Sequence, residues 1–232
     1  MTTAAAAPAD GSDEPALPEW RVGDSLQPLE REMIDNAAAG ERLDLLDEPA
    51  PDLQAMRAWG PERTIRAAVL RRLLVESDWP VHAKGIRLRG VRISGAVDLE
   101  AATLRCPLWL STCFFDDPQP VQLNYATASL LVIASSHLAG LQGDRLMVSK
   151  RLSLTGSTFT QPVRLLVAEI TGQLNCRGAQ LQGSDGDGDA LVAEGLKVGG
   201  HMLLDEGFTA DGAIVLSAAE ITGDLNCRGA QL

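Results

Sequence analysis

The sequence predicts a mainly β protein: a four-sided parallel β-solenoid that carries a small α-helical cap near its N-terminus. Two observations predict this fold. From Gly85 onward, apolar residues recur with a period of eleven, and within each period they come in pairs two residues apart. Residues two apart share one face of an extended strand, and such short strands bury that face only by stacking on one another.

Residues 1–18 consist mostly of Ala, Pro, Asp, Glu and Gly, with almost no large apolar side chain. Ordering such a segment would cost more conformational entropy than its burial recovers, so we expect a disordered tail. The whole chain of 232 residues is 45% hydrophobic but only 4% aromatic. Its core therefore has to be built from aliphatic side chains.

Residues 19–82 are expected to form a helical capping region with three helices, each opened by a proline. Pro28 opens the first helix, which Gly40 closes, and Pro51 opens the second. The third follows Pro61 and has an apolar stripe, which needs an apolar surface to lie on. The stripe consists of Ile65, Val69, Leu70, Leu73 and Leu74.

Residues 83–232 form the predicted repeat domain, in which nine units of eleven residues align. The second place of every unit is aliphatic, the fourth and ninth are apolar, and the seventh is mostly small. Residues 167–181 and 218–232 match at 13 of 15 positions, which indicates duplication. Two units make one coil with four sides. A leucine-rich repeat has a similar repeat length and is the second-ranked fold, since its L-x-x-L-x-L pattern is absent here. Since the last unit stops two residues short, we expect the repeat domain to be truncated at its C-terminus.

Three triplets, at residues 102–104, 179–181 and 230–232, have the form A-x-L. They resemble the A-(D/N)-L-x-x motif of the pentapeptide-repeat proteins, over about residues 85–232, although here the period is five plus six and Thr or Gln stands in the middle. This resemblance implies a right-handed, four-sided β-helix. Residues 63–77 together with 84–104 also resemble a group of bacterial repeat proteins, some of which are labelled membrane-associated oxidoreductases.

The pattern offers neither a cofactor site nor a metal site. No G-x-G-x-x-G follows a strand, no redox C-x-x-C occurs, and the three histidines fall in different units. Cys176 and Cys227 hold the inward fourth place of units two coils apart, roughly 10 Å at about 4.8 Å per coil, so both thiols are expected to stay reduced. Cys113 occupies a small inward seventh place. We therefore expect no enzyme active site and no cofactor.

The insertion SDGDGD at residues 184–189 places Asp185, Asp187 and Asp189 at alternate positions, as at the start of a calcium-binding loop. The rest of such a loop is missing, because Ala190 follows and Leu196 stands where a bidentate Glu belongs. The sequence therefore predicts a solvated loop rather than a metal site.

Trp109 and Phe114 are the candidate partner-binding residues. They lie in the unit PLWLSTCFFDD, whose inward places are filled by other residues, so both aromatic side chains have to point outward. Exposed aromatic groups need a cover. Two covers are open at this point: the apolar face of the N-terminal helices, or a protein partner.

The main functional hypothesis is a non-enzymatic scaffold or protein–protein interaction module that binds a protein partner or itself. A DNA mimic that binds a topoisomerase, which the pentapeptide resemblance implies, is one alternative, and an oxidoreductase-associated protein is another. The net charge of −11 argues against binding of nucleic acid, since phosphate contacts need clustered cations. Because no apolar run approaches the roughly 20 residues of a membrane helix and the N-terminus lacks a secretory signal, we expect a cytoplasmic location, with membrane association only through parts outside this chain.

Overall fold

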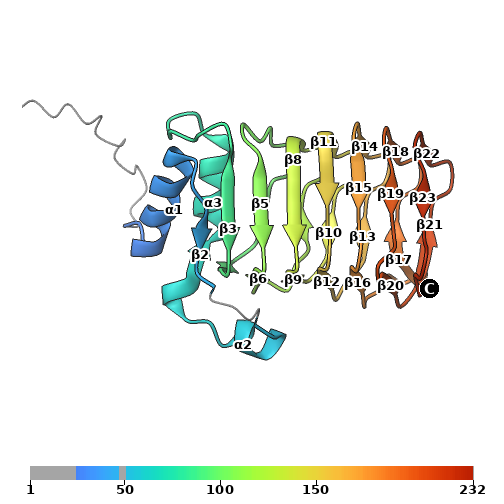
Figure 1. Cartoon of the computed structure of the whole chain (residues 1–232), viewed down its shortest axis with the longest axis horizontal. Helices are drawn as coiled ribbons and strands as arrows, with labels where there is room; N and C mark the ends of the chain where they lie inside the picture. Colours follow the sequence, from blue (N-terminus) through green and yellow to red (C-terminus); the bar gives the residue numbers. More distant parts are fainter. Residues whose placement is uncertain (1–24, 47–50, 232) are drawn as a thin grey trace, which may run out of the picture.

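The structure is a computed structural model that describes residues 25–46 and 51–231. These residues form a parallel β-solenoid of about six turns, with the helices near its N-terminal end (Figure 1). The predicted β-solenoid with few helices is therefore confirmed. The expected tail at residues 1–18 lies outside the described residues.

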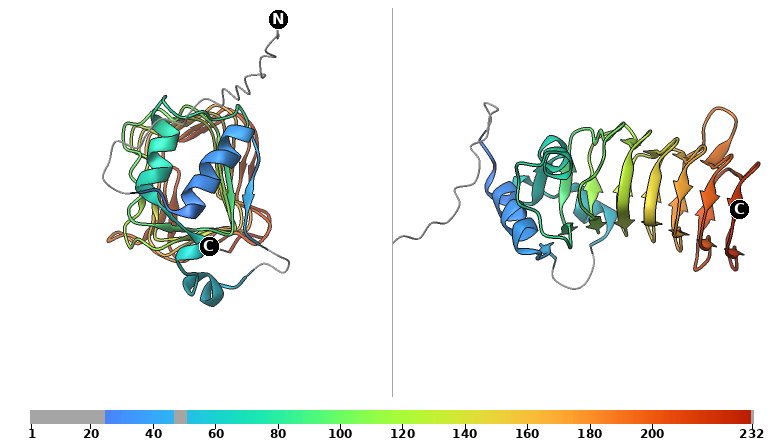
Figure 2. Two further views of the ribbon diagram at one scale, coloured as in Figure 1. Left: turned by 90° about the vertical axis from the view of Figure 1, so that its left-hand side faces the viewer. Right: turned by 90° about the horizontal axis from the view of Figure 1, so that it is seen from above.

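Helices α1 and α3 lie across the N-terminal end of the solenoid (Figure 2), whereas α2 lies beside it (Figure 1). Helix α1 (Pro28–Ala39) begins at the expected proline, and Gly40 ends it with a φ of 70°. Helix α2 (Leu53–Arg57) is short, and its start is capped by the Asp52 side chain, which accepts a hydrogen bond from the Ala55 amide at 2.8 Å. The helices follow the start and stop signals of the sequence closely.

The third helix differs from the expectation. A single 3₁₀ turn η1 (Pro61–Arg63) follows the proline, the chain then extends as strand β2 (Thr64–Arg66), and helix α3 (Ala67–Val75) begins only afterwards. Ile65 fits the apolar stripe of a helix, yet it is fully buried as the inward residue of a strand that pairs with Ile93. Burial on the first complete coil therefore outweighs the local helical pattern.

The capping region thus contributes two strands to the solenoid. Strand β1 (Leu43–Asp44) pairs with β3 (Ile86–Arg89), and β2 pairs with β4 (Arg92–Ser94). Stacking begins before residue 83, and the upstream edge of the first coil is covered. Buried Glu30 of α1 fixes this arrangement, because its carboxylate accepts hydrogen bonds from the Arg66 guanidinium at 2.6 and 2.7 Å.

The paired segments lie in four rows along the solenoid. The first row continues from β3 through β5 (Leu108–Ser111), β8 (Thr127–Ala134), β11 (Met147–Ser153), β15 (Gln173–Asn175), β19 (Met202–Leu203) and β23 (Leu225–Asn226). The second row continues from β4 through β6 (Phe114–Phe115), β9 (His137–Leu138), β12 (Thr158–Phe159), β16 (Gln180–Leu181) and β20 (Thr209–Ala210).

The third row contains β7 (Val121–Gln122), β10 (Leu141–Gln142), β13 (Val163–Arg164), β17 (Asp189–Val192) and β21 (Ala213–Val215). The fourth row contains β14 (Glu169–Ile170), β18 (Lys197–Val198) and β22 (Glu220–Ile221). Strands β8 and β11 pass continuously from the fourth row into the first, so these two rows form one sheet.

The core follows the predicted inward places. The second and ninth places of the units are buried along most of the solenoid; in the last coil Ile214 and Ile221 are partly exposed and Leu225 is exposed. Leu174 and Cys176 are both buried, so they share one side of the backbone, as the two-residue spacing requires. Further units at residues 120–128, 140–148 and 202–210 complete the stack, although the sequence pattern alone did not align them.

The sixth place of every unit turns the chain, because its φ is positive throughout. Glycine holds this place in some units, for example Gly178 and Gly195, whereas Tyr125, Arg145 and Val167 hold it in others. A non-glycine side chain in this region is crowded by its own backbone, at a cost of about 1–2 kcal/mol. The turn is thus imposed by stacking rather than by residue type.

The fourth and seventh places share one interior volume. In most units the fourth is large and the seventh small, as with Leu99 and Ala102. Two units reverse the order: Gly143 precedes Leu146, and Ala193 precedes Leu196, all four residues being buried. A Cβ atom at Gly143 would lie 3.0 Å from the end of the Leu165 side chain, so that neighbour would have to shift to accept a larger residue there.

Candidate interaction surface

Trp109 and Phe114 both point outward, as the sequence predicts, but the structure does not bring them together. Trp109 lies on β5 in the first row, in register with Arg87 and Val132, and 37% of its surface is exposed. Phe114 lies on β6 in the second row and is half-buried. The two side chains therefore belong to different faces of the solenoid.

The cover of Trp109 is a guanidinium group. The Arg151 side chain from β11 lies over the indole, with its guanidinium carbon 5.4 Å from the ring centroid. Val132 lies on the intervening strand and is buried, although its place in the strand is outward. A cation over the face of Trp is attracted by the ring quadrupole. The Nε atom of Arg151 is buried without a hydrogen-bond partner, so this guanidinium is only partly satisfied.

Phe114 is contacted by Arg92 of β4 and lies beside α2 of the capping region. Arg92 lies 5.8 Å from its ring centroid and is held in place by Asp116, whose carboxylate accepts from the Arg92 Nε at 2.9 Å. Leu53 and Arg57 of α2 line the same groove as Phe114. The sequence left two covers open, the N-terminal helices or a protein partner. Helix α2 lies beside Phe114, whereas the Arg151 side chain covers Trp109.

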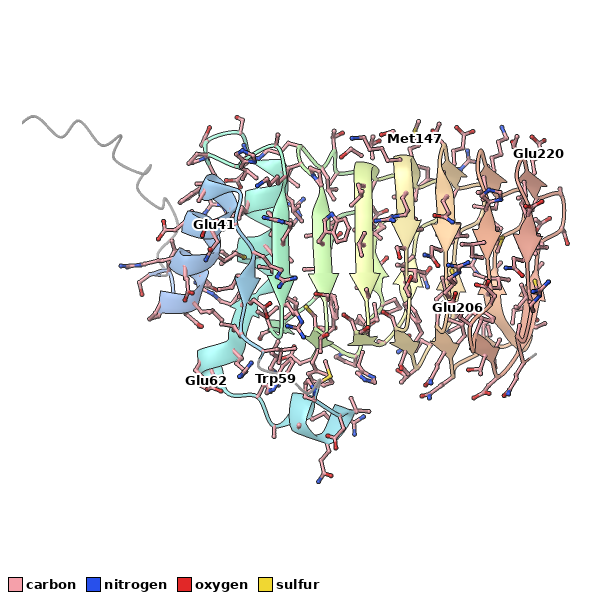
Figure 3. All side chains as sticks on the ribbon, viewed as in Figure 1. Glu41, Trp59, Glu62, Met147, Glu206 and Glu220 are labelled. Carbon is pink, nitrogen blue, oxygen red and sulfur yellow. The ribbon has the colours of Figure 1, made fainter. Side chains whose placement is uncertain are left out.

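Two exposed apolar side chains near β8 and β11 were not predicted. Tyr125 is 60% exposed and Met147 is 51% exposed. Met147 lies on β11 at the outer edge of the solenoid (Figure 3). Its register partner, Thr127, is two residues from Tyr125. Arg145 lies over the Tyr125 ring at 6.0 Å, a second cation–aromatic pair.

We call the outward residues of this region the β8–β11 surface. It comprises Met147, Lys150 and Arg151 on β11, Trp109 on β5, and Tyr125 and Arg145 at the turns that precede β8 and β11. The sequence signal for it was the repeat itself: aligning residues 120–128 and 140–148 as units places Tyr125 and Arg145 at the sixth position and Met147 at the eighth. Both positions point outward.

The β8–β11 surface is locally basic in a chain of net charge −11. Within the described residues, Arg145, Lys150 and Arg151 form no ion pair. Two acidic neighbours already have cation partners: Asp144, next to Arg145 in sequence, pairs with Arg164 at 3.5 Å, and Glu169, in register with Met147, pairs with Lys197 at 3.3 Å. Three cations are therefore available to an external carboxylate.

Cys106, Cys113 and Cys176 are buried, whereas Cys227 is exposed in the last coil, so the predicted inward place holds for Cys113 and Cys176 but not for Cys227. Burial raises the pKa of the Cys113 and Cys176 thiols to about 12 in each case, so both stay protonated at neutral pH. Leu204 occupies the rung between Cys176 and Cys227, which places the two thiols two rungs apart. All four cysteines are free.

The histidines remain scattered. His82 and His201 each accept a backbone hydrogen bond through Nδ1, from Lys84 at 3.1 Å and from Asp224 at 2.9 Å. His137 is half-buried in the groove beside α2, where burial and the charge of Arg57 lower its pKa. In the part of the chain that the structure describes, no three His, Cys, Asp or Glu side chains form a group that could hold a metal ion.

The acidic insertion is organised by its own backbone. Asp185 Oδ1 accepts hydrogen bonds from the amides of Asp187 and Asp189, both at 3.0 Å. These hydrogen bonds lower the pKa of Asp185, the bond from Asp189 most strongly. Its carboxylate therefore closes the loop as a turn-forming acceptor.

Among residues 25–46 and 51–231, no helix has both the length and the apolar character needed to cross a bilayer. No protein-family model matches the chain, and comparisons with curated proteins and with solved structures likewise give no match.

Proposed function

We propose that this protein is a non-enzymatic interaction module whose β8–β11 surface binds an acidic segment of a partner protein. The observation that carries the proposal is the pair of exposed cation–aromatic stacks, Arg151 on Trp109 and Arg145 on Tyr125. Neither guanidinium has a carboxylate partner within the described residues.

The composition of the surface supports this role. Trp, Tyr, Arg and Met are the residue types enriched in protein–protein interfaces, and Trp, Tyr and Arg dominate their binding energy. The parallel β-scaffold beneath keeps these side chains at fixed spacing, so little conformational entropy is lost on binding. A partner carboxylate that reached Arg145 or Arg151 would form a charge-assisted hydrogen bond against an aromatic surface that already excludes water.

The distribution of carboxylates favours this role over DNA mimicry. A DNA mimic needs rows of unpaired acids, whereas four acids of the solenoid pair with cations on adjacent rungs. The pairs are Asp116 with Arg92, Asp144 with Arg164, Asp205 with Arg177 and Glu169 with Lys197. The A-x-L resemblance to pentapeptide-repeat proteins stays a prediction, and a binding module is consistent with it.

Photocrosslinking from the surface itself tests the proposal. A photoreactive phenylalanine analogue replaces Tyr125 in the native host, and the same analogue replaces Asp211, an exposed residue distant in sequence, as the control. We expect one protein to be captured from position 125 and not from position 211. That protein is then purified, and its acidic segment is mapped.

Binding of the purified partner is measured for the double variant R145E/R151E and for the matched variant R31E, which reverses an exposed charge on α1. Two lost charge-assisted contacts predict at least a tenfold weaker dissociation constant for the double variant and no change for R31E. Equal capture at both crosslinking positions, or equal loss of affinity in both charge variants, would contradict the proposal.

A further inference from the structure

A second feature of the surface lies on a different face of the solenoid. Helix α2 lies beside the second row and, with it, encloses a groove of about 280 Å³. Leu53 and Arg57, four residues apart and hence on one face of α2, line one wall. Fully buried Met56 and nearly buried Trp59 anchor the segment, and the Trp59 carbonyl accepts a hydrogen bond from Arg92 at 3.1 Å. The groove is thus a fixed part of the fold.

The floor of the groove is a column of outward side chains on three successive rungs. Phe114, His137 and Thr158 are register partners on β6, β9 and β12. Neighbouring strands are about 4.8 Å apart, so the column presents an aromatic ring, an imidazole and a hydroxyl group in that order. An apolar surface lies at one end and hydrogen-bonding groups at the other.

The electrostatics of the groove favour an anion. Arg57 forms no ion pair within the described residues, and its guanidinium is near enough to His137 to help lower the pKa of that imidazole. One acidic side chain, Asp117, also lines the groove, and its Oδ1 accepts a hydrogen bond from the Gln119 amide at 2.9 Å. Gln161 Nε2 donates a hydrogen bond to the Pro118 carbonyl at 2.8 Å, which fixes this side chain in the lining.

We propose that this groove binds a small organic carboxylate. The carboxylate lies between the Arg57 guanidinium and the His137 and Thr158 side chains, and a short apolar body lies against Phe114 and Leu53. A guanidinium presents donors that match a carboxylate in geometry. The groove volume falls at the lower end of small-molecule sites, which suits an acid of about ten heavy atoms.

The proposal is tested by NMR titration of the full chain with benzoate and with its neutral isostere, benzamide. We expect benzoate to shift resonances of His137 and Thr158 with a dissociation constant below about 1 mM, and benzamide to bind at least tenfold more weakly. An acetylated dipeptide with a free C-terminus, compared with its C-terminal amide, distinguishes a peptide end from a free organic acid as the source of the carboxylate.

Three variants locate the site. R57A is expected to weaken benzoate binding at least tenfold and R57K to retain part of it, whereas R31A, the control on α1, should leave it unchanged. Arg57 is exposed, so its replacement leaves the fold intact, which circular dichroism verifies. Absence of saturable shifts with either acid at 10 mM, equal binding of benzoate and benzamide, or unchanged affinity in R57A would each overturn the proposal.

Discussion

Exchanging Ala193 and Leu196 tests whether the interior of the solenoid is governed by the volume that two places share. Both side chains are fully buried in the same unit, with the small residue at the fourth place and the large one at the seventh. The variant A193L/L196A restores the usual order. That order already exists in two stacked units, where Leu99 is followed by Ala102 and Leu123 by Ala126.

The single substitutions are expected to be costly. L196A removes three buried carbon atoms and leaves a cavity, at about 3 kcal/mol, and A193L inserts the same volume into a filled interior, at about 1–3 kcal/mol. The double variant conserves volume, so it should cost less than about 1.5 kcal/mol. The coupling between the two sites is then about 3 kcal/mol in favour of the double variant, well above the additivity expected of independent sites.

Urea denaturation followed by far-ultraviolet circular dichroism measures the midpoint and slope for the parent, both single variants and the double variant. Slopes have to agree across the four proteins for the midpoints to report stability, because solenoids can lose cooperativity. The reasoning is refuted if the double variant is as unstable as the two single losses added together.

Three further outcomes are expected. V167G should raise the free energy of unfolding by about 0.5–1 kcal/mol, because glycine relieves the backbone strain at a φ of 54°, although its larger entropy in the unfolded chain offsets part of the gain. Thermal denaturation measures the change, and a variant less stable than the parent would argue against strain at this position. Burial raises the pKa of Glu30, but hydrogen bonds and the charge of Arg66 outweigh it and the net pKa is lowered. The stability that the Glu30–Arg66 pair contributes is therefore fully present above the usual carboxyl pKa and is lost as the pH falls through the lowered pKa of Glu30. E30Q should lower the free energy of unfolding by about 3 kcal/mol at pH 7 and make the urea midpoint less dependent on pH in the acid range. Ser136 Oγ accepts the Cys113 amide at 3.0 Å in the interior, so S136A should cost about 1–3 kcal/mol, while an unchanged urea midpoint would show that the amide finds another partner.

The inward places were predictable from the sequence because one property, burial of aliphatic side chains, selects the second and ninth places of each unit. The missed unit at residues 140–148 keeps this rule, because Leu141 and Val148 are both buried, but it departs from the usual order of the fourth and seventh places. Gly143 and Leu146 exchange the usual large and small residues, so a template with an apolar fourth place rejects the unit although its total volume is conserved. Strand β2 was missed for another reason: Ile65 fits a helical stripe and a strand equally well, and only pairing with β4 decides between them.

The candidate binding residues also fall into two groups, those that the hydrophobic pattern predicts and those that it does not. Trp109 and Phe114 were found because a complete unit surrounds them, which leaves only outward positions for their rings. Tyr125 and Arg145 were missed because their position is defined by backbone conformation, a positive φ at the sixth place, and no hydrophobic pattern reports it. Once that place is recognised as a turn, any large side chain found there has to project from a corner of the solenoid.

The difference between inward and outward places explains why the sequence pattern predicts the fold of this protein more directly than its binding residues. Inward places are constrained by stacking on both neighbouring rungs, so their residue types repeat and reveal the architecture. Outward places carry no such constraint, so each can change without loss of the core, and binding chemistry appears wherever neighbouring rungs place complementary side chains together. Trp109 and Arg151 lie on strands two rungs apart, and Ser153 rather than Arg151 is in register with Trp109 through Val132. The long Arg151 side chain reaches the indole diagonally, with its guanidinium carbon 5.4 Å from the ring centroid. In such a solenoid, a binding site is therefore formed by outward side chains on neighbouring rungs of one row, which are distant in sequence, rather than by residues that follow one another in the chain.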